Sequence, residues 1–281
     1  MKMASMKTLW GLMFSTTVAV IVVLAVKTIC KPKPTTKHLQ KIMGHPKYCV
    51  KACPTIPNSP RFYSQCGEDR GVYTKYFSSP IVQCNGTYLE IGALDGIRYS
   101  NTKFFEDNLG WTGILIEAEP NNYQALVKNR PNSKTYGKAI CPDGQRTAKF
   151  AGGRATGGVV DYMSEHHKKS YIGNAKTIEV PCISMKTLLG EAEVTHIDFF
   201  SLDVEGGELS VLQTMDWNIP VRTFVIEFGH NETKDQAVRA LLAKQGYIKP
   251  SWDIRSFCVP GGDCAPNEIF ENKNQEQFTC M

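Results

Sequence analysis

The sequence predicts a doubly wound α/β domain with a mostly parallel sheet, placed behind a single membrane-spanning helix. Three observations support this fold class. Residues 8–26 form a run of nineteen residues without a charge. From residue 61 onward, short apolar runs alternate with amphipathic stretches, which is typical of buried parallel strands separated by helices. Charged residues make up 21% of the chain and hydrophobic residues 42%, which excludes a disordered chain.

The apolar run is long enough to cross a membrane. As a helix, residues 8–26 would span about 28 Å, close to the roughly 30 Å thickness of the hydrocarbon core. The alternative is a cleaved signal peptide, whose apolar region is usually shorter and ends at small residues. The sequence AVKT at residues 25–28 fits such a cleavage site poorly. We therefore expect a short tail at residues 1–7 and an uncleaved anchor at residues 8–26.

The segment after the anchor differs in composition from the rest of the chain. Residues 27–60 are rich in Lys and Pro and are expected to form an extended stem, followed by the folded domain at residues 61–281. Residues 1–60 contain nine Lys and no Arg, Asp or Glu, so they carry +9; with a net charge of +5, the domain carries −4. A mildly acidic domain argues against nucleic acid as a partner. The sequence has no quartet of Cys and His at metal-ligand spacing, so it predicts no metal site.

Two sets of observations disagree about which side of the membrane the domain occupies. More Lys residues follow the anchor than precede it, which favours the cytosol by the positive-inside rule. The ten Cys, and the glycosylation sequons at Asn85 and Asn231, favour an oxidising lumen instead. Cys49 and Cys53 could pair with each other or with the domain. We expect a single-pass membrane protein with a lumenal domain, and the cytosolic face is the alternative.

The elements of the domain follow from its apolar periodicity. Strands are expected at residues 87–91, 113–117, 135–139, 196–203 and 222–227. Helices are expected at residues 99–109, 121–129, 209–215 and 233–245. Asn121 is the expected N-cap of the second helix. Gly246 ends the last helix, and residues 247–249 and 268–271 are expected to form a closing hairpin. Sheets of this kind bind ligands beyond the carboxyl ends of their strands.

The first two strand ends carry residues suited to a nucleoside. Gly92 and Gly96 allow a sharp turn and a close approach of the backbone to a ligand. Glu117, at the next strand end, is placed to accept hydrogen bonds from the hydroxyls of a ribose. The dinucleotide motif G-x-G-x-x-G is absent, and Glu90 and Asp95 would repel a diphosphate. These acids suit a nucleoside with a cationic tail, such as S-adenosylmethionine. The alternative is a plain strand-turn-helix with surface acids.

A pair of carboxylates follows the predicted strand at residues 196–203. Asp203 and Glu205 stand beside Gly206 and Gly207. Acids at the end of an apolar strand are difficult to explain as core packing, so we expect both at the mouth of the same cleft. The alternative is structural: the pair would bind the backbone amides of the glycine turn.

Four stretches of the chain resemble the FkbM-type methyltransferases, a class I group that uses S-adenosylmethionine. They are SQCGED at residues 64–69, YLEIGALDGIRYSNTKFFEDNLGWTGILIEAEP at residues 88–120, VPCISMKTLL at residues 180–189 and IDFFSLDVEGGELSVL at residues 197–212. The resemblance covers about residues 62–230, which is most of the folded domain. The resemblance implies a seven-stranded sheet whose last strand is antiparallel, and methylation of a hydroxyl on a sugar or another acceptor. Membrane-anchored eukaryotic members are similar to the Star-type proteins, for which trafficking is the alternative to catalysis.

The resemblance also implies roles for single residues. The expected ligands of S-adenosylmethionine are Glu90, Gly92, Asp95 and Gly96 at its methionine part, Glu117 at its ribose, and Ala118, Lys138 and Ala139 at its adenine. On the acceptor side, the candidates for the base that removes the hydroxyl proton are, in order, Asp203, Glu205, Glu227 and His230. His166 and His167 lie in a polar stretch, and we expect both to be solvated.

The leading hypothesis is a lumenal, membrane-anchored O-methyltransferase that acts on a hydroxyl of a glycan or small molecule. One alternative is a non-catalytic protein that uses the same fold to bind cargo or a partner. The other is a cytosolic enzyme tethered to a membrane face. The sequence identifies no protein partner.

Overall fold

The computed structural model describes residues 54–80, 82–153, 155–258, 264 and 266–278. The predicted tail, the predicted anchor and most of the predicted stem lie outside the described residues, and so does the whole of a separate unit, Met1–Lys47. Among the residues that are described, no helix is long and apolar enough to cross a membrane.

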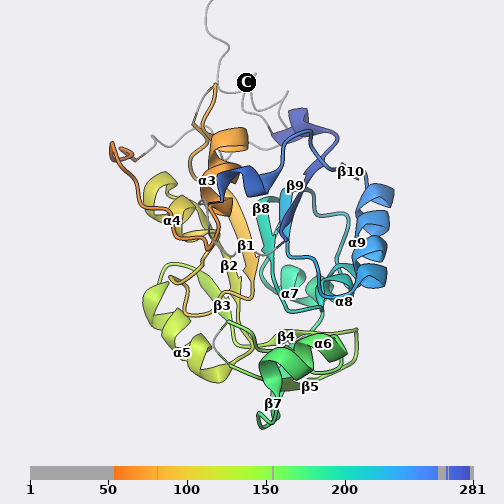
Figure 1. Ribbon diagram of the computed structural model, residues 1–281. Helices are drawn as coiled ribbons and strands as arrows, with labels where there is room; N and C mark the ends of the chain where they lie inside the picture. Colours follow the sequence, from red (N-terminus) through yellow and green to blue (C-terminus); the bar gives the residue numbers. More distant parts are fainter. Residues whose placement is uncertain (1–53, 81, 154, 259–263, 265, 279–281) are drawn as a thin grey trace, which may run out of the picture. The chain divides into compact units, whose positions relative to one another are not determined.

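A seven-stranded sheet forms the centre of the described domain (Figure 1). Its strand order is β10-β11-β9-β8-β1-β2-β3; β11 is antiparallel to both of its neighbours, and the other pairs are parallel. The strands are β1 (Thr87–Ile91), β2 (Thr112–Ile116), β3 (Lys134–Tyr136), β8 (Ile197–Leu202), β9 (Val221–Ile226), β10 (Tyr247–Ile248) and β11 (Glu268–Asn272). The prediction of a mostly parallel, seven-stranded sheet with a reversed last strand is confirmed.

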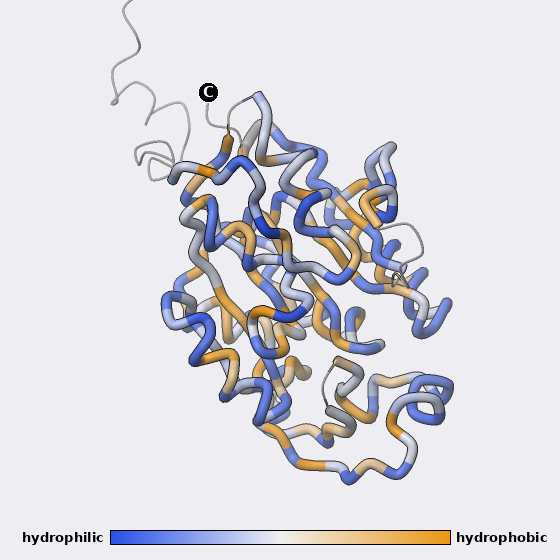
Figure 2. The backbone as a smooth tube through the Cα atoms, turned by 60° about the vertical axis from the view of Figure 1, so that its left-hand side comes forward, coloured by the Kyte–Doolittle hydropathy of each residue, from blue (hydrophilic) through white to orange (hydrophobic). Residues whose placement is uncertain are grey.

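Alternate side chains of each strand pack on opposite faces of the sheet, which creates two hydrophobic cores. Leu89 and Ile91 of β1 belong to one core and Tyr88 to the other; Phe200 and Leu202 of β8 likewise belong to the first core and Phe199 to the second. Every residue of β8 and β9 is buried, which explains why both sequences are almost continuously apolar. Figure 2 shows hydrophobic residues running along the central strands, with hydrophilic residues concentrated in turns and on the outer helices.

Helices cover both faces of the sheet. One core receives side chains from α3 (Glu68–Val72), α4 (Lys103–Leu109) and α5 (Pro120–Asn129). The other receives them from α7 (Met185–Glu191), α8 (Glu208–Gln213) and α9 (Glu232–Lys244). In Figure 1, α4 and α5 lie on the opposite side of the sheet from α8 and α9. Shorter helical segments are η1 (Tyr73–Phe77), η2 (Lys168–Ile172), η3 (Ile254–Phe257) and η4 (Gln275–Phe278). The doubly wound arrangement is therefore confirmed.

A second sheet, which the sequence analysis did not predict, follows β3 in the chain. Its order is β4-β7-β5-β6. Its strands are β4 (Ala139–Ile140), β5 (Thr147–Ala151), β6 (Gly158–Val159) and β7 (Ile178–Ile183). A disulfide joins Cys141 to Cys182 where β4 pairs with β7. The short helix α6 (Glu165–His167) lies between β6 and β7 in the chain, and Figure 1 shows this whole region at one end of the main sheet.

Two predicted elements differ from the observed ones for local reasons. The expected helix at residues 99–109 begins only at Lys103, because Tyr99 has a φ of 60° and residues 100–102 turn back toward β1. The expected strand at residues 135–139 is divided between β3 and β4, which belong to different sheets.

The predicted N-cap of α5 was also wrong. The Glu119 carboxylate accepts a hydrogen bond of 2.7 Å from Asn122 N and so caps the helix, whereas Asn121 lies inside the first turn. Pro120 occupies the first helical position, where proline is favoured because its missing N–H has no intrahelical partner. That proline is the sequence signal that would have located this start.

Candidate active site

A cavity of about 590 Å³ lies at the carboxyl ends of the parallel strands. Its lining includes the residue that follows each of four strands: Gly92 after β1, Glu117 after β2, Asp203 after β8 and Glu227 after β9. The backbone N–H of each continues the parallel ladder, because it donates to the last residue of a neighbouring strand. The volume is typical of small-molecule sites, and the cavity lies where the strand-end rule places a ligand.

Gly92 lets the loop after β1 come close to the loop after β8. Its φ is 83°, and a Cβ atom at this position would lie 1.9 Å from the carbonyl oxygen of Asp203. No side chain fits at that separation, and the backbone conformation itself favours glycine. Gly92 is therefore required for the two loops to form adjoining parts of the cavity wall.

Glu90 lines the cavity, but its carboxylate also holds the chain that follows. It accepts hydrogen bonds from Asn101 N (2.7 Å), Ser100 Oγ (2.8 Å) and Thr102 Oγ1 (2.6 Å). Burial raises the pKa of this carboxyl. Glu90 therefore shapes the cavity by fixing residues 100–102 in front of α4.

Asp95 and Gly96 lie outside the lining of the cavity, although the resemblance placed them at the methionine part of a cofactor. Asp95 Oδ1 accepts hydrogen bonds from the N–H groups of Ile97 and Arg98, at 2.9 and 2.7 Å. Gly96 has a φ of 78°, and a Cβ atom there would lie 2.6 Å from Arg130 Cγ. Both residues shape the turn after β1 and its packing against the end of α5.

Glu117 faces the cavity from the end of β2. Its Oε2 accepts a hydrogen bond from Leu94 N and its Oε1 one from Glu119 N, both at 2.8 Å. Burial raises the pKa of Glu117 to about 7. Because a carboxylate oxygen has two lone pairs, each oxygen can accept a further hydrogen bond from a ligand in the cavity.

The second sheet supplies another wall of the cavity. Ala139, the first residue of β4, lines it together with Ala118 and Lys138, the three residues expected near an adenine. Phe150 of β5 and Val159 of β6 line it as well. The second sheet therefore encloses the cavity from a direction that the main sheet leaves open.

Asp203 and Glu227 end adjacent central strands, and their carboxyl groups share a hydrogen bond. The Asp203 side chain is exposed at the cavity. Desolvation by the surrounding protein, and then the nearby Glu227, raise the pKa of Asp203 well above its usual range. Burial, and then Glu205, raise the pKa of Glu227. Two carboxyl groups that share a hydrogen bond hold at least one proton between them.

Glu205 and two histidines lie next to this pair. His230 Nε2 is 2.7 Å from Glu227 Oε2 and 3.7 Å from Glu205 Oε2. His167 Nδ1 is 3.4 Å from the same Glu205 oxygen, and His167 Nε2 is 3.0 Å from the carbonyl oxygen of Thr156. The Glu205 and Glu227 side chains are each 12% exposed. Glu205 and His230, both expected on the acceptor side, therefore belong to one cluster on the cavity wall.

His167 contradicts the prediction that both histidines of this stretch are solvated. His166 is exposed, as expected, whereas His167 is 3% exposed and lines the cavity. Ser164 Oγ accepts a hydrogen bond of 3.1 Å from His167 N and caps α6. This cap fixes which side of the short helix turns inward. In the local sequence, only the capping Ser164 indicates which side of the helix turns inward, because the neighbouring residues show no apolar pattern.

The turn after β8 is held by Glu208 rather than by the carboxylate pair. Glu208 Oε1 accepts hydrogen bonds from Val204 N (3.1 Å) and Gly206 N (3.2 Å). The alternative role of Asp203 and Glu205, as acceptors for the amides of this turn, is therefore not needed to explain its conformation. Their carboxylates are left to face the cavity.

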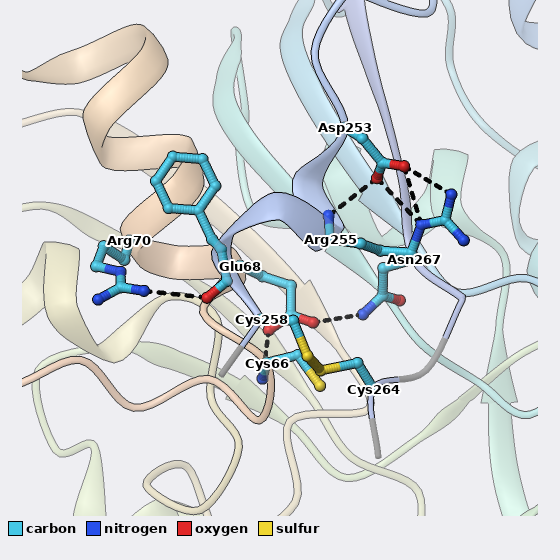
Figure 3. Close-up of a disulfide and its surroundings, with 9 residues drawn as sticks. Cys66, Glu68, Arg70, Asp253, Arg255, Cys258, Cys264 and Asn267 are labelled. Atoms are coloured by element: carbon cyan, nitrogen blue, oxygen red, sulfur yellow. Dashed lines mark hydrogen bonds and ion pairs between the residues drawn. A yellow bond between two sulfur atoms is a disulfide. The ribbon is translucent and has the colours of Figure 1, made fainter. Parts of the chain in front are cut away.

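The C-terminal part of the domain forms one more side of the cavity. Figure 3 shows the Cys258–Cys264 disulfide beside Cys66 and Glu68. The Glu68 carboxylate accepts hydrogen bonds from Cys66 N (2.9 Å) and Asn267 Nδ2 (2.7 Å). Glu68, Cys264 and Asn267 all line the cavity. The disulfide therefore helps to position this side of the wall.

The strand order of the main sheet and the place of the cavity define the class I, Rossmann-like methyltransferase fold. The sequence profile described as the methyltransferase FkbM domain matches residues 90–249. This match covers more than half of the 281 residues, and the chain belongs to the FkbM methyltransferase family. No curated protein matches the sequence significantly.

Solved structures similar to the domain share little sequence with it. A TehB-like S-adenosylmethionine-dependent methyltransferase from Corynebacterium glutamicum is 13% identical, with a TM-score of 0.37 over 76% of this chain and 89% of that one. The human methyltransferase 10 domain-containing protein is 13% identical, with a TM-score of 0.38 over 85% and 94%. The fibrillarin pre-rRNA processing protein of Methanococcus jannaschii is 12% identical, with a TM-score of 0.38 over 67% of each chain.

Proposed function

We propose that the protein transfers the methyl group of S-adenosylmethionine to a hydroxyl group of a glycan or small molecule, at a membrane of the secretory pathway. The observation that carries this proposal is the convergence of Gly92, Glu117, Asp203 and Glu227 on one cavity in an FkbM methyltransferase domain. The cofactor lies along the ends of β1 and β2, and the acceptor lies beside the ends of β8 and β9.

The cofactor half of the cavity includes Gly92, Glu117, Ala118, Lys138 and Ala139. Glu117 accepts hydrogen bonds from the ribose hydroxyls through its remaining lone pairs. Gly92 lines this half of the cavity, where its backbone can contact the methionine part. Ala118, Lys138 and Ala139 flank the adenine, and the two alanines leave room for a flat base.

The acceptor half supplies the base. As the acceptor oxygen attacks the methyl carbon, an O–C bond forms, the C–S bond breaks and the sulfonium becomes a neutral thioether. The hydroxyl proton must leave as the new bond forms, and Asp203 on the cavity wall accepts it in the form of the pair in which Glu227 carries the shared proton. Glu227 is a positioning residue, because its hydrogen bond with Asp203 holds that carboxyl at the strand end.

A transfer assay tests this activity. Full-length protein in detergent is incubated with S-adenosylmethionine labelled at its methyl group and with a panel of glycans and small alcohols. Products that survive mild alkali are methyl ethers, whereas methyl esters are hydrolysed, so the assay separates hydroxyl from carboxyl acceptors. Transfer to none of the acceptors would favour the alternative in which the fold only binds cargo or a partner.

The affinity for S-adenosylmethionine is expected to fall as the pH is lowered. The pKa of Glu117 is about 7, and only its ionised form offers both oxygens to the ribose as acceptors. If the protonated form does not bind, the Kd rises about thirtyfold between pH 8.5 and pH 5.5. Glu117→Gln, which cannot titrate, should bind more weakly and lose most of this dependence. Identical pH profiles for the two proteins, measured by calorimetry, would remove the ribose assignment.

The location is supported by the apolar run at residues 8–26 and by disulfides, which persist in oxidising compartments. Asn231 is exposed; its Oδ1 caps α9 by accepting a hydrogen bond from Lys234 N, which leaves its amide nitrogen available for a glycan. Asn85 is different, because its Nδ2 is buried and the folded domain has no room for a glycan there. The sequence-based expectation at Asn85 is therefore dropped.

In eukaryotic cells, glycosidase treatment is expected to increase the gel mobility of the protein. Asn231→Gln should abolish this shift, whereas Asn85→Gln should leave it unchanged. If protease added outside sealed microsomes degrades the domain, the domain faces the cytosol and the lumenal location is rejected.

A further inference from the structure

The ring of His167 is held so that one of its nitrogens faces another acceptor. The Thr156 carbonyl, 3.0 Å from His167 Nε2, can only accept a hydrogen bond, so Nε2 carries the proton of the neutral ring. Nδ1 then presents a lone pair, and Glu205 Oε2, 3.4 Å away, presents lone pairs as well. The residue is 3% exposed, so bulk water does not screen the two atoms. Either an additional proton or a metal cation has to lie between them.

The charge around this point favours a metal cation. Within the part of the chain that the structure describes, Glu205 and Glu227 form ion pairs with His167 and His230 alone, and no Lys or Arg forms an ion pair with Asp203. The Glu205 and Glu227 side chains are each 12% exposed, and carboxylates so largely removed from water are costly unless they are paired or coordinate a metal. A proton shared between Glu227 and Asp203 leaves Glu205 charged, whereas a divalent cation compensates it.

The spacing of the nitrogen and oxygen atoms fits a coordination sphere. Ligand atoms about 2.1 Å from a metal are about 3.0 Å apart at neighbouring octahedral positions and about 3.4 Å apart at tetrahedral ones. The separations here are 3.4 Å from His167 Nδ1 to Glu205 Oε2, 3.7 Å from His230 Nε2 to the same oxygen, and 2.7 Å from His230 Nε2 to Glu227 Oε2. The ligand atoms of His167, Glu205 and His230 all lie within 4.8 Å of one another. The Thr156 carbonyl is the kind of outer partner that orients a metal-binding histidine.

We propose that His167, Glu205 and His230 bind a divalent transition-metal ion such as Zn²⁺ or Mn²⁺. Imidazole nitrogens suit these ions, whereas Mg²⁺ and Ca²⁺ prefer oxygen ligands. The residues come from α6 and from the segments after β8 and β9, so their sequence spacing matches no compact metal motif. This proposal replaces the expectation that the chain has no metal site.

The role of the ion, though not its binding, rests on the proposed function. All three ligands line the cavity, so a coordination position of the ion can face an acceptor. An ion there binds the acceptor oxygen and stabilises the negative charge that develops on it, while Asp203 takes the proton. The site therefore selects acceptors whose hydroxyl reaches the ion and the methyl group together.

Metal binding is measured by calorimetry on untagged full-length protein, purified in detergent and stripped with a chelator. One Zn²⁺ or Mn²⁺ per chain should bind, with much weaker binding of Mg²⁺ and Ca²⁺. His167→Ala and Glu205→Gln should each weaken the affinity at least tenfold. The matched control is His166→Ala, because His166 is exposed on the same helix and should leave metal binding unchanged. Co²⁺ should give visible absorption bands with the wild type and lose them with His167→Ala.

The metal site is overturned if the chelator-stripped wild type binds none of Zn²⁺, Mn²⁺ and Co²⁺ at one ion per chain. This outcome is measured on the wild type, so it does not depend on whether a variant folds. An equal loss of affinity in His166→Ala and His167→Ala also overturns it. Titration of the same preparation with S-adenosylmethionine separates the two proposals. If the protein binds the cofactor but no metal, the proposed function stands and the metal site is rejected. If it binds metal but not the cofactor, the metal site stands and the proposed function is rejected.

Discussion

Replacing Asp203 by Asn is expected to lower methyl transfer by ~10²–10⁴-fold, the usual contribution of a general base. The amide has nearly the same shape as the carboxyl but cannot accept the hydroxyl proton. Asp203 is exposed to the cavity, while Glu208 holds the amides of the adjoining turn, so the fold should survive the change. Initial rates at saturating acceptor, together with the affinity for S-adenosylmethionine, measure the two effects separately.

The matched control is Asp143→Asn, which makes the same chemical change at an exposed turn outside the cavity lining. It should leave both the rate and the cofactor affinity as in the wild type. Full activity of Asp203→Asn would reject the base assignment. A loss of cofactor affinity equal to the loss of rate would instead make Asp203 a binding residue.

Gly92→Ala is expected to destabilise the domain by about 2–5 kcal/mol, because two costs combine. The φ of 83° is unfavourable for a residue with a Cβ, and that Cβ would lie 1.9 Å from the carbonyl oxygen of Asp203. Since both atoms belong to backbone segments that end central strands, neither can move without disturbing the sheet. Urea-induced unfolding of the full-length protein in detergent measures the loss.

Gly144→Ala provides the comparison, since Gly144 has a φ of 85° but no atom within 4 Å of an added Cβ. Only the conformational cost of about 1–2 kcal/mol applies there. Equal losses at the two glycines would show that the close approach to Asp203 contributes nothing. The difference between the two variants therefore measures the loop contact itself.

The main sheet could be predicted from the sequence because its strands are buried on both faces. The mostly apolar sequences of β8 and β9 place both strands in the centre of the sheet. Gly246 ends the preceding helix, and the pairing of β10 with β11 comes after it. The second sheet could not be found in this way. Two of its strands are two residues long, and its pairing depends on contacts between distant segments and on the Cys141–Cys182 disulfide.

The sequence analysis located the candidate-site residues that follow strands, but it missed a residue that comes from the segment between β6 and β7. Glu117, Asp203 and Glu227 follow apolar strands, so the sheet alone brings them together. His167 lies in a polar stretch far from them in sequence, and it reaches Glu205 from α6, which lies beside the second sheet (Figure 1). Asp95 looked equally suitable as a site residue, but it turns its carboxylate to the backbone of its own loop.

The central claim is that the cavity at the strand ends binds S-adenosylmethionine. Calorimetric titration of the folded, full-length protein with S-adenosylmethionine and with its demethylated product tests it most directly. We expect saturable binding of one molecule of either compound per chain, weakened by roughly 1.5–3 kcal/mol in Glu117→Ala, the range for a hydrogen bond to a charged group. No binding of either compound to the folded wild type, or binding that Glu117→Ala leaves unchanged, would contradict it.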